Sequence, residues 1–152
     1  MLKVKIKPVR ENFKMPIKGT EDASCFDCYA SEIEIQPDGA VHVKLGFKTE
    51  IPECWRADLL PRSNITKYGW VLQNSPGTID SDFRNEWQAR FRPIPVNDVE
   101  FGLVGMQPFP YVVGDRVCQI RFERVNPVEF ILEDSLSDTE RGLGGFGHTG
   151  NK

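Results

Sequence analysis

The sequence has little net charge and no long apolar run. Its formal net charge is −3, so no basic field covers the surface to attract nucleic acid. None of its hydrophobic stretches approaches the roughly 18–20 residues of a membrane-spanning helix, and Met1-Leu2-Lys3 does not open a signal peptide. We therefore expect a cytoplasmic protein with no nucleic-acid or membrane partner, which holds any anionic ligand with a few local cations and backbone donors.

Cysteine is also scarce, and its spacing gives little support to a metal or redox site. Cys25 and Cys28 form a C-x-x-C, but no second such pair follows, and Cys54 and Cys118 stand alone. In an extended segment, Cys25 and Cys28 would point to opposite faces, because the side-chain period of a strand is two. Buried free thiols are the favoured interpretation.

Short alternating runs separated by turn residues are abundant. Eleven prolines and thirteen glycines interrupt these runs, a pattern typical of an all-β chain. A chain of 152 residues is expected to form one domain with a sizeable core. Apolar and polar residues alternate, as in strands with one solvent-facing side, over residues 2–7, 32–35, 41–51, 87–92, 116–122 and 128–132.

Residues 62–69 are the one stretch that favours a helix. Ser63 or Asn64 is expected to cap its start, and Gly69 suits the left-handed position just past its end. A helix start that carries Arg62 and a hydroxyl is a suitable phosphate site, because free N–H groups and the helix dipole converge there. The alternative is a one-turn connector with a solvated Arg62.

The segment Asn74–Glu86 is the one around which the functional interpretation is organised. Its Pro76-Gly77 turn, flanked by short runs of strand-type residues, predicts a hairpin. Backbone groups at a hairpin tip can pair with the edge of a planar ligand, and the carboxylate of Asp80 could deprotonate a water. An ordinary turn with a capping aspartate is the alternative.

Two further segments carry candidate features. Gln119 is expected to point away from the apolar face formed by Cys118, Ile120 and Phe122, together with Val117. Residues 93–111 are proline-rich and predict an elaborated loop or an extra hairpin. The tail 134–152 cannot bury enough apolar surface to order itself, although its glycine-spaced backbone and Arg141 could wrap a polyphosphate.

Taken together, the chain resembles the homotrimeric all-β dUTPases (deoxyuridine 5'-triphosphate nucleotidohydrolases) over nearly its whole length. Each motif alone is of middling specificity, whereas five in the family's order are very specific. The five blocks are 24–30, 61–69, 74–86, 114–119 and 141–150. The resemblance implies a jelly-roll-like (β-clip) fold with one short helix, a β domain at residues 1–133, and a flexible glycine-rich arm at residues 134–152.

The resemblance also implies roles for single residues. Asp80 would be the general base that activates a water for in-line attack on the α-phosphorus of dUTP, giving dUMP and pyrophosphate. Phe83 would lie beneath the deoxyribose and exclude a 2′-hydroxyl. The uracil would be read at the hairpin and covered by the arm, by Asn74, Gly77, Thr78, Ile79 and Phe146.

Phosphate and metal contacts follow from the same resemblance. Asp27 would hold waters of a Mg²⁺ ion chelated by the triphosphate, and the sites would be shared between subunits of a homotrimer. The phosphates would be contacted by Arg62, Ser63, Asn64 and Gln119, and by Arg141, Gly147, His148 and Thr149 of the arm. The chain departs from the usual family pattern at Cys25, Asn64, Phe83, Asn85 and His148, and in the length of 93–111, but no catalytic group is lost.

Two alternatives stay open at this point. A dCTP deaminase of the same fold would need a glutamate base after the hairpin and an arginine in the helix block, where this chain has Glu86 in a different context and Lys67. A dUTPase-like scaffold that binds a regulatory protein through residues 93–111 is the other, because fold does not fix function. The resemblance places the protein in a bacterial or phage-infected cell.

Overall fold

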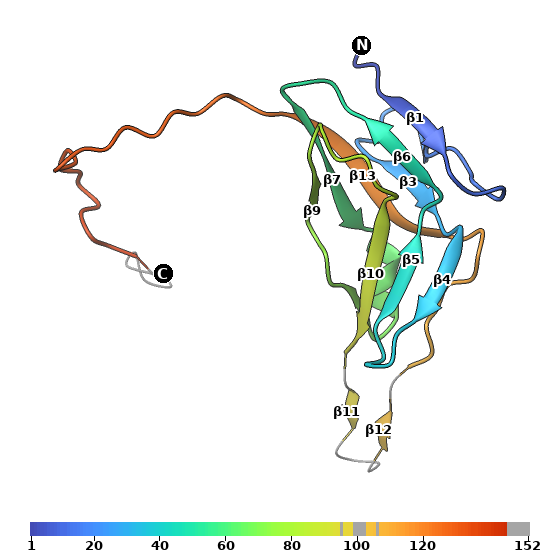
Figure 1. The fold of residues 1–152 in the computed structure, drawn as a ribbon. Coiled ribbons are helices and arrows are strands. Elements are labelled where there is room, and N and C mark those ends of the chain that lie inside the picture. The colour runs from blue at the N-terminus through green and yellow to red at the C-terminus, as the bar shows by residue number, and fades with distance from the viewer. Residues whose placement is uncertain (95, 99–102, 106, 146–152) are drawn as a thin grey trace.

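The structure is a computed structural model, which describes residues 1–94, 96–98, 103–105 and 107–145 (Figure 1). In these residues it contains thirteen strands and one short 3₁₀ helix, η1 (Ser63–Lys67). The strands are β1 (Lys5–Pro8), β2 (Ile17–Lys18), β3 (Phe26–Tyr29), β4 (Glu32–Ile35), β5 (Val41–Lys44), β6 (Phe47–Glu50), β7 (Trp55–Pro61), β8 (Trp70–Leu72), β9 (Gly77–Ile79), β10 (Gln88–Pro93), β11 (Val96–Asp98), β12 (Leu103–Gly105) and β13 (Arg116–Arg124). The all-β prediction is confirmed.

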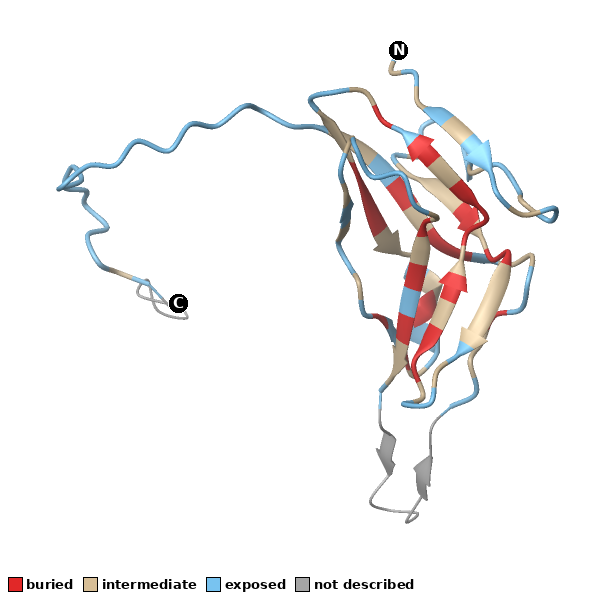
Figure 2. Cartoon of the chain, viewed as in Figure 1, coloured by how far each residue is buried: buried red, intermediate tan, exposed pale blue. Residues whose placement is uncertain are grey.

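Two antiparallel sheets enclose the core. One has five strands in the order β2-β3-β13-β7-β9, and the other has four in the order β4-β5-β10-β8. Their inner faces supply one cluster of buried side chains, seen as red segments in Figure 2. Phe91 of β10 is fully buried there, and burial of one such side chain contributes about 1.5–3 kcal/mol to folding. No helix in the described part of the chain is long and apolar enough to cross a membrane.

The single long strand predicted over 41–51 is two strands. β5 belongs to the four-stranded sheet, whereas β6 pairs with β1 in a separate ribbon. The break falls at Gly46, whose φ is +80°, and a Cβ there would lie 2.3 Å from Ser31 Oγ. The alternation continues across the break, because Val43, Leu45 and Phe47 are all buried. Periodicity detected the buried face correctly but could not detect the change of sheet.

The outward orientation predicted for Val117 is wrong. Val117 and Cys118 are both fully buried, and the register between β13 and β3 shifts between Arg116 and Cys118. A β-bulge of this kind inserts one extra residue and turns neighbouring side chains out of strict alternation. Gln119, beyond the bulge, is only partly buried.

The helix block is a 3₁₀ turn without the predicted caps. η1 has no side-chain cap at its start, and its last backbone bond is donated by the extended Tyr68 to Ile65. Gly69 is not among the glycines of the described chain with a positive φ. Pro61 ends β7, so the chain does arrive extended. A one-turn connector therefore describes this block better than a capped helix with a dipole, but the solvated Arg62 of that alternative is wrong, because Arg62 is hydrogen-bonded to Asp27.

The strand predicted over 128–132 is absent from the structure. Residues 124–143 are all exposed and run away from the body as an extended arm (Figures 1 and 2). Val128, Phe130 and Leu132 are 73%, 96% and 99% exposed. In the described part of one chain, this alternating segment pairs with no strand. The boundary between domain and arm at residues 133–134 stays a prediction.

Residues 93–111 include a hairpin of β11 and β12, paired from Val96↔Gly105 to Asp98↔Leu103. The segment that follows it is attached to the body by aromatic packing. The indole N–H of Trp70 donates to the Gln107 and Pro108 carbonyl oxygens at 2.9 and 3.2 Å. The Phe109 ring lies 5.1 Å from that of Trp70 and 5.5 Å from that of Tyr111. The extra-hairpin prediction is thus confirmed.

Candidate active site

The outer face of the five-stranded sheet brings the first group of predicted residues together. Asp27 of β3 lies directly across from Gln119 of β13, which in turn lies across from Leu60 of β7. Cross-strand partners share a face. Asp27 and Gln119 therefore project side by side, near the end of β7 that carries Arg62.

Arg62 is held in place by hydrogen bonds. Its Nε donates to Asp27 Oδ1 at 2.9 Å, and its Nη1 donates to the carbonyl oxygen of Arg116 at 3.2 Å. Arg116 Nη1 donates to the other oxygen of Asp27 at 3.2 Å, and Gln119 Nε2 donates to the Pro61 carbonyl oxygen at 2.8 Å. Two guanidinium groups share the Asp27 carboxylate, and each keeps further N–H donors that suit an anion such as a phosphate.

A polar cavity of about 390 Å³ opens beside this cluster. The Tyr111 hydroxyl donates to Asn64 Oδ1 at 3.2 Å in its wall, and burial raises the pKa of Tyr111. Sequence reasoning did not assign a role to Tyr111 or Arg116, although Arg116 stands inside one of the quoted motifs. The cavity is lined by Arg62, Asn64, Tyr68, Pro110, Tyr111, Asp115 and Arg116.

The turn around Gly77 connects the two sheets instead of closing a hairpin between β8 and β9. β8 pairs with β10, whereas β9 pairs with β7. Asn74 braces the turn, because its Nδ2 donates to the Gln88 carbonyl oxygen at 3.0 Å and its Oδ1 accepts from the Arg90 N–H at 2.8 Å. A Cβ on Gly77 would lie 2.7 Å from the Asn74 carbonyl oxygen, so the close approach requires glycine.

Asp80 follows the end of β9 and is exposed. It lines a cavity of about 410 Å³ together with Thr78 and Ser81. The Phe83 N–H donates to the Asp80 carbonyl oxygen at 3.2 Å, which closes a turn, and the Phe83 side chain is exposed. The loop therefore presents both a carboxylate and an aromatic ring to solvent.

The Asp80 loop and the Arg62 cluster lie apart in one chain. Ile79 pairs with Ala57, so Asp80 comes next to Arg56, whereas Arg62 is six residues further along the chain. At the rise of a strand this is about 20 Å. One chain therefore assembles two partial sites.

A charged quartet, not found from the sequence, lies between these partial sites. Asp58 is buried, with its side chain 3% exposed, and it pairs with Arg56 at 3.5 Å and Arg121 at 3.4 Å. Both arginines also pair with Glu123 at 3.0 Å. Burial of a charge requires such partners. In the sequence of β7, the signal for this quartet was limited to an acidic residue, Asp58, at a position where alternation places the side chain on the outer face of the sheet.

The carboxylate of Glu86 is fully engaged. It accepts two hydrogen bonds from Arg10, at 2.6 and 2.9 Å, and one from the Gly46 N–H at 3.1 Å. The Arg10 hydrogen bond lowers the pKa of Glu86, and burial opposes this effect. A carboxylate held ionised in this way is a poor general base. The structure therefore offers the deaminase alternative no base at this position.

Metal ligation by the protein alone finds no support in the described residues. They contain no group of three or more His, Cys, Asp or Glu side chains close enough to hold an ion. The four cysteines are free, and Cys28 lies directly across from Cys118 in the core. Asp27 is the one predicted metal contact. Each of its oxygens accepts one hydrogen bond and keeps a lone pair for a metal-bound water.

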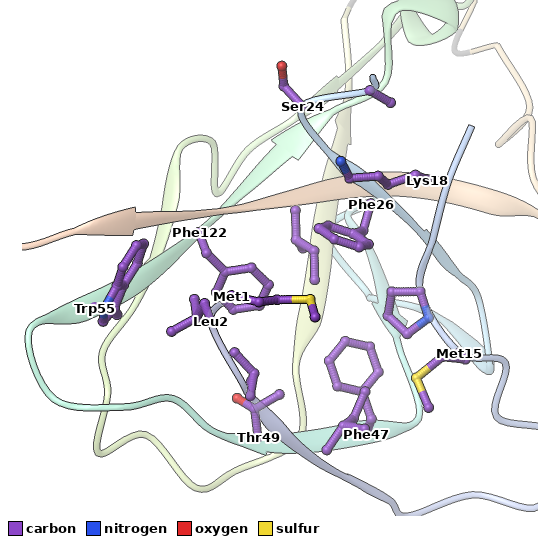
Figure 3. Close-up of a pocket in the computed structure, with 15 residues that line it drawn as sticks. Met1, Leu2, Met15, Lys18, Ser24, Phe26, Phe47, Thr49, Trp55 and Phe122 are labelled. Atoms are coloured by element: carbon purple, nitrogen blue, oxygen red, sulfur yellow. The ribbon is translucent and has the colours of Figure 1, made fainter. Parts of the chain in front are cut away.

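A further cavity, of about 550 Å³, is mostly apolar and is lined by none of the predicted site residues (Figure 3). Figure 3 shows Leu2 facing Phe47 and Phe122 across it. In the arm, Arg141 Nε donates to the Gly144 carbonyl oxygen at 2.9 Å. Phe146, Gly147, His148 and Thr149, which were also predicted to contact the substrate, lie outside the described residues.

Known proteins resemble the chain in sequence and in fold. A family model described as dUTPase matches residues 11–150. A deoxyuridine 5'-triphosphate nucleotidohydrolase of Caldanaerobacter subterraneus subsp. tengcongensis is 34% identical over 99% of this chain and 97% of that protein.

Two solved phage enzymes share the fold. A tyrosine-to-phenylalanine variant of the Staphylococcus bacteriophage 80alpha dUTPase, solved with dUpNHpp, matches with a TM-score of 0.79 at 19% identity over 97% of this chain and 98% of that one. It is described among phage dUTPases that control transfer of virulence genes. A dUTPase variant of phage phi11 of S. aureus, described with a structural Mg(II) ion, matches with a TM-score of 0.70 at 15% identity over 88% of this chain and 97% of that one.

Proposed function

The chain belongs to the dUTPase family and is a dUTP diphosphatase, and from this premise we propose that Asp80 is its general base. Asp80 takes a proton from a water, whose oxygen attacks the α-phosphorus of dUTP in line. The bond from that phosphorus to the bridging oxygen of the β-phosphate breaks, and dUMP and pyrophosphate result. The observation that carries this role is the exposed Asp80 carboxylate, which the turn to Phe83 holds at the edge of a cavity.

The segment on either side of Asp80 reads the base and the sugar. The backbone of Gly77, Thr78 and Ile79 pairs with the uracil edge and excludes a 5-methyl group, and the close approach of Gly77 to the Asn74 carbonyl oxygen fixes this backbone. Asn74, whose amide is engaged with β10, holds this backbone in position. Phe83 excludes a 2′-hydroxyl. The family usually has a tyrosine at this position. Phenylalanine lacks its phenolic hydroxyl but keeps the aromatic ring that excludes the 2′-hydroxyl.

The Arg62 cluster binds the phosphates. Arg62, Ser63, Asn64 and Gln119 converge on this end of the sheet, and the guanidinium of Arg62 is already oriented by Asp27. Transition-state charge spreads over the phosphoryl oxygens, so cations and N–H donors fixed in advance lower the barrier.

Mg²⁺ fits this site as an ion carried by the triphosphate. Magnesium keeps several waters and takes few protein ligands, which agrees with a single carboxylate, Asp27, and no protein cage in the described residues. When bound, the ion would neutralise charge on the phosphates. Asp27 would hold metal-bound water while also orienting Arg62.

The separation of about 20 Å along β7 supports a site shared between subunits of a homotrimer. Asp80 and Phe83 of one copy then face the Arg62 cluster of a neighbour. The arm, from about residue 134, closes over the site, with Phe146 on the uracil and Arg141, Gly147, His148 and Thr149 toward the phosphates.

The first part of the exposed tail docks on β1 of a neighbouring copy. Leu2, Val4 and Ile6 line the 550 Å³ cavity, and β1 pairs only with β6 in the described chain, so its other edge is free. The tail offers a matching apolar period at Val128, Phe130 and Leu132. The charges have opposite sign, with Lys3 before β1, Lys5 and Lys7 on β1, and Glu129 and Glu133 on the tail, although Lys5 also pairs with Glu50. Added strands are stabilised by such pairing.

Mixing two inactive variants tests both the base and the sharing of sites. Alone, Asp80→Asn subunits are expected to lose most of their turnover, and Arg62→Gln subunits to lose about 10–100-fold in kcat/KM. After unfolding and refolding together, random assortment should give about a quarter of the sites both native residues, if these come from different chains. Release of pyrophosphate from dUTP measures the recovery. No recovery from a mixed trimer would place Asp80 and Arg62 in the same subunit.

A regulatory protein partner on the β11–β12 hairpin is a second, compatible function. It is supported by the likeness to phage enzymes described as controlling transfer of virulence genes and by a hairpin whose base is anchored while its strands, in the described part of the chain, pair only with each other. Replacing residues 95–106 with a short linker should retain dUTP hydrolysis and abolish capture of the partner. Partner capture that survives this replacement would refute a binding role for the hairpin.

A further inference from the structure

The loop that carries Asp80 and Phe83 ends in a set of contacts with residues that lie outside the five motifs. Its last residue, Glu86, precedes the fully buried Trp87, whose N–H donates to the Phe47 carbonyl oxygen at 3.1 Å. The Leu45 N–H donates to the Trp87 carbonyl oxygen at 3.0 Å. The loop is thereby fastened to the junction between β5 and β6, where the chain changes sheets.

Arg10 completes this attachment from the segment that follows β1. Its Nε and Nη2 hold the two oxygens of Glu86, and its Nη1 pairs with Glu32 of β4. The Gly46 N–H, at the one position where a Cβ would strike Ser31, donates to Glu86 as well. The side chains of Arg10 and Glu86 are 30% and 14% exposed, so solvent screens the pair only in part.

We propose that the Arg10–Glu86 pair is a positioning device for the reaction, which fixes the loop holding Asp80 and Phe83. Arg10 lies one residue outside the part of the chain that the family model matches. The other end of the loop follows the three-residue edge strand β9, which pairs with β7. Arg84 restrains the loop internally, through bonds to the Ser81 and Phe83 carbonyl oxygens. Besides the backbone bonds of Trp87, the loop is therefore oriented relative to the body by the contacts of the Glu86 carboxylate.

The inference rests on the role proposed for Asp80 and Phe83, and it predicts a specific kinetic pattern. In Arg10→Met the loop keeps its residues but gains freedom. A displacement of about 1 Å at a reacting group can cost about 100-fold in rate. We expect kcat for dUTP to fall 10-fold or more, and the preference for dUTP over UTP to shrink because Phe83 is no longer held against the sugar.

A readout independent of catalysis separates this inference from the proposed function. Arg84 is exposed within the loop, and trypsin cleavage after Arg84, followed by mass spectrometry, reports the opening of the loop. Arg10→Met and Glu86→Gln should each speed that cut at least 10-fold under conditions where the domain is folded. Arg92→Met is the matched control, since it removes the exposed Arg92–Asp38 ion pair without touching the loop.

Several outcomes are decisive. If Arg10→Met lowers thermal stability but leaves both the selectivity and the cleavage rate after Arg84 unchanged, the pair is merely structural and the inference is wrong. If Arg10→Lys, which cannot make the two-pronged contact, behaves as wild type, the geometry of the pair is irrelevant. If Arg10→Met accelerates cleavage after Arg84 but Asp80→Asn is fully active, the positioning role of the ion pair is supported and the base role of Asp80 is refuted.

Discussion

The two halves of the site are built on different principles. The Arg62 cluster stands on three neighbouring strands, β3, β13 and β7, and its polar side chains are tied to one another and to the backbone. The Asp80 loop follows an edge strand, and its far end is held by the Arg10–Glu86 pair and by the backbone bonds of Trp87. The residues proposed to bind phosphate thus stand on neighbouring strands within the sheet. The position of the residues proposed for chemistry and base selection depends on a few long-range contacts.

Among the variants that test this comparison, Asp80→Asn is expected to have the largest effect. The amide cannot accept the proton of the attacking water, whereas the loop and the Arg62 cluster remain intact. We expect turnover to fall to less than about a tenth of the wild-type rate, and by as much as several orders of magnitude, whereas dUTP binding is retained. Steady-state kinetics together with calorimetric binding of dUTP check this. A variant that keeps more than a tenth of its activity would remove Asp80 from the base role.

Truncation after Arg141 should have the next largest effect, because it removes the part of the arm proposed to close over both halves. We expect kcat to fall at least 10-fold while the trimer persists, since the segment 125–134 proposed to bind a neighbour is retained. Sedimentation velocity and activity are measured on the same sample. Dissociation to monomers would make the end of the arm structural and leave its closing role unsupported.

Arg62→Gln tests the half proposed to bind phosphate. It removes the cation but keeps a hydrogen-bond donor, and it leaves Asp27 with Arg116 alone. We expect kcat/KM for dUTP to fall about 10–100-fold, or ~1.4–2.7 kcal/mol of transition-state stabilisation. Unlike Arg10→Met, this change should not alter cleavage after Arg84. If both variants open the loop equally, the two halves are not independent.

The smallest effect concerns acid stability. The pKa of Glu86 is lowered in the folded protein, chiefly by its hydrogen bond from Arg10. A depressed pKa means that the stabilisation is fully present above the unfolded pKa, about 4.3, and is lost as pH falls through the folded pKa. Glu86→Gln should therefore reduce stability at neutral pH and flatten its decline below about pH 4.3. Denaturant unfolding at several pH values measures both slopes, and parallel curves for the two proteins would contradict the assignment.

Local patterns were sufficient to predict the fold class and the family. Alternation over short runs, with prolines and glycines between them, predicts an all-β chain, and the order of five motifs identifies the family. The same patterns correctly placed the buried face of residues 41–51 and the extra hairpin in 93–111. These features depend on side-chain direction and turn chemistry, which neighbouring residues determine.

Only the tertiary structure decided which residues meet. Asp27 and Arg62 are 35 residues apart, and Arg10 and Glu86 are 76 apart, so neither pair leaves a periodic trace in the sequence. The bulge that buries Val117 and the change of sheet at Gly46 also depend on partners elsewhere in the chain. The segment 128–132 has the pattern of a strand, yet it stays exposed in one chain. Pattern gives a segment its preference for a strand, but pairing requires an edge to join, and the arrangement of the whole fold determines where an edge is free.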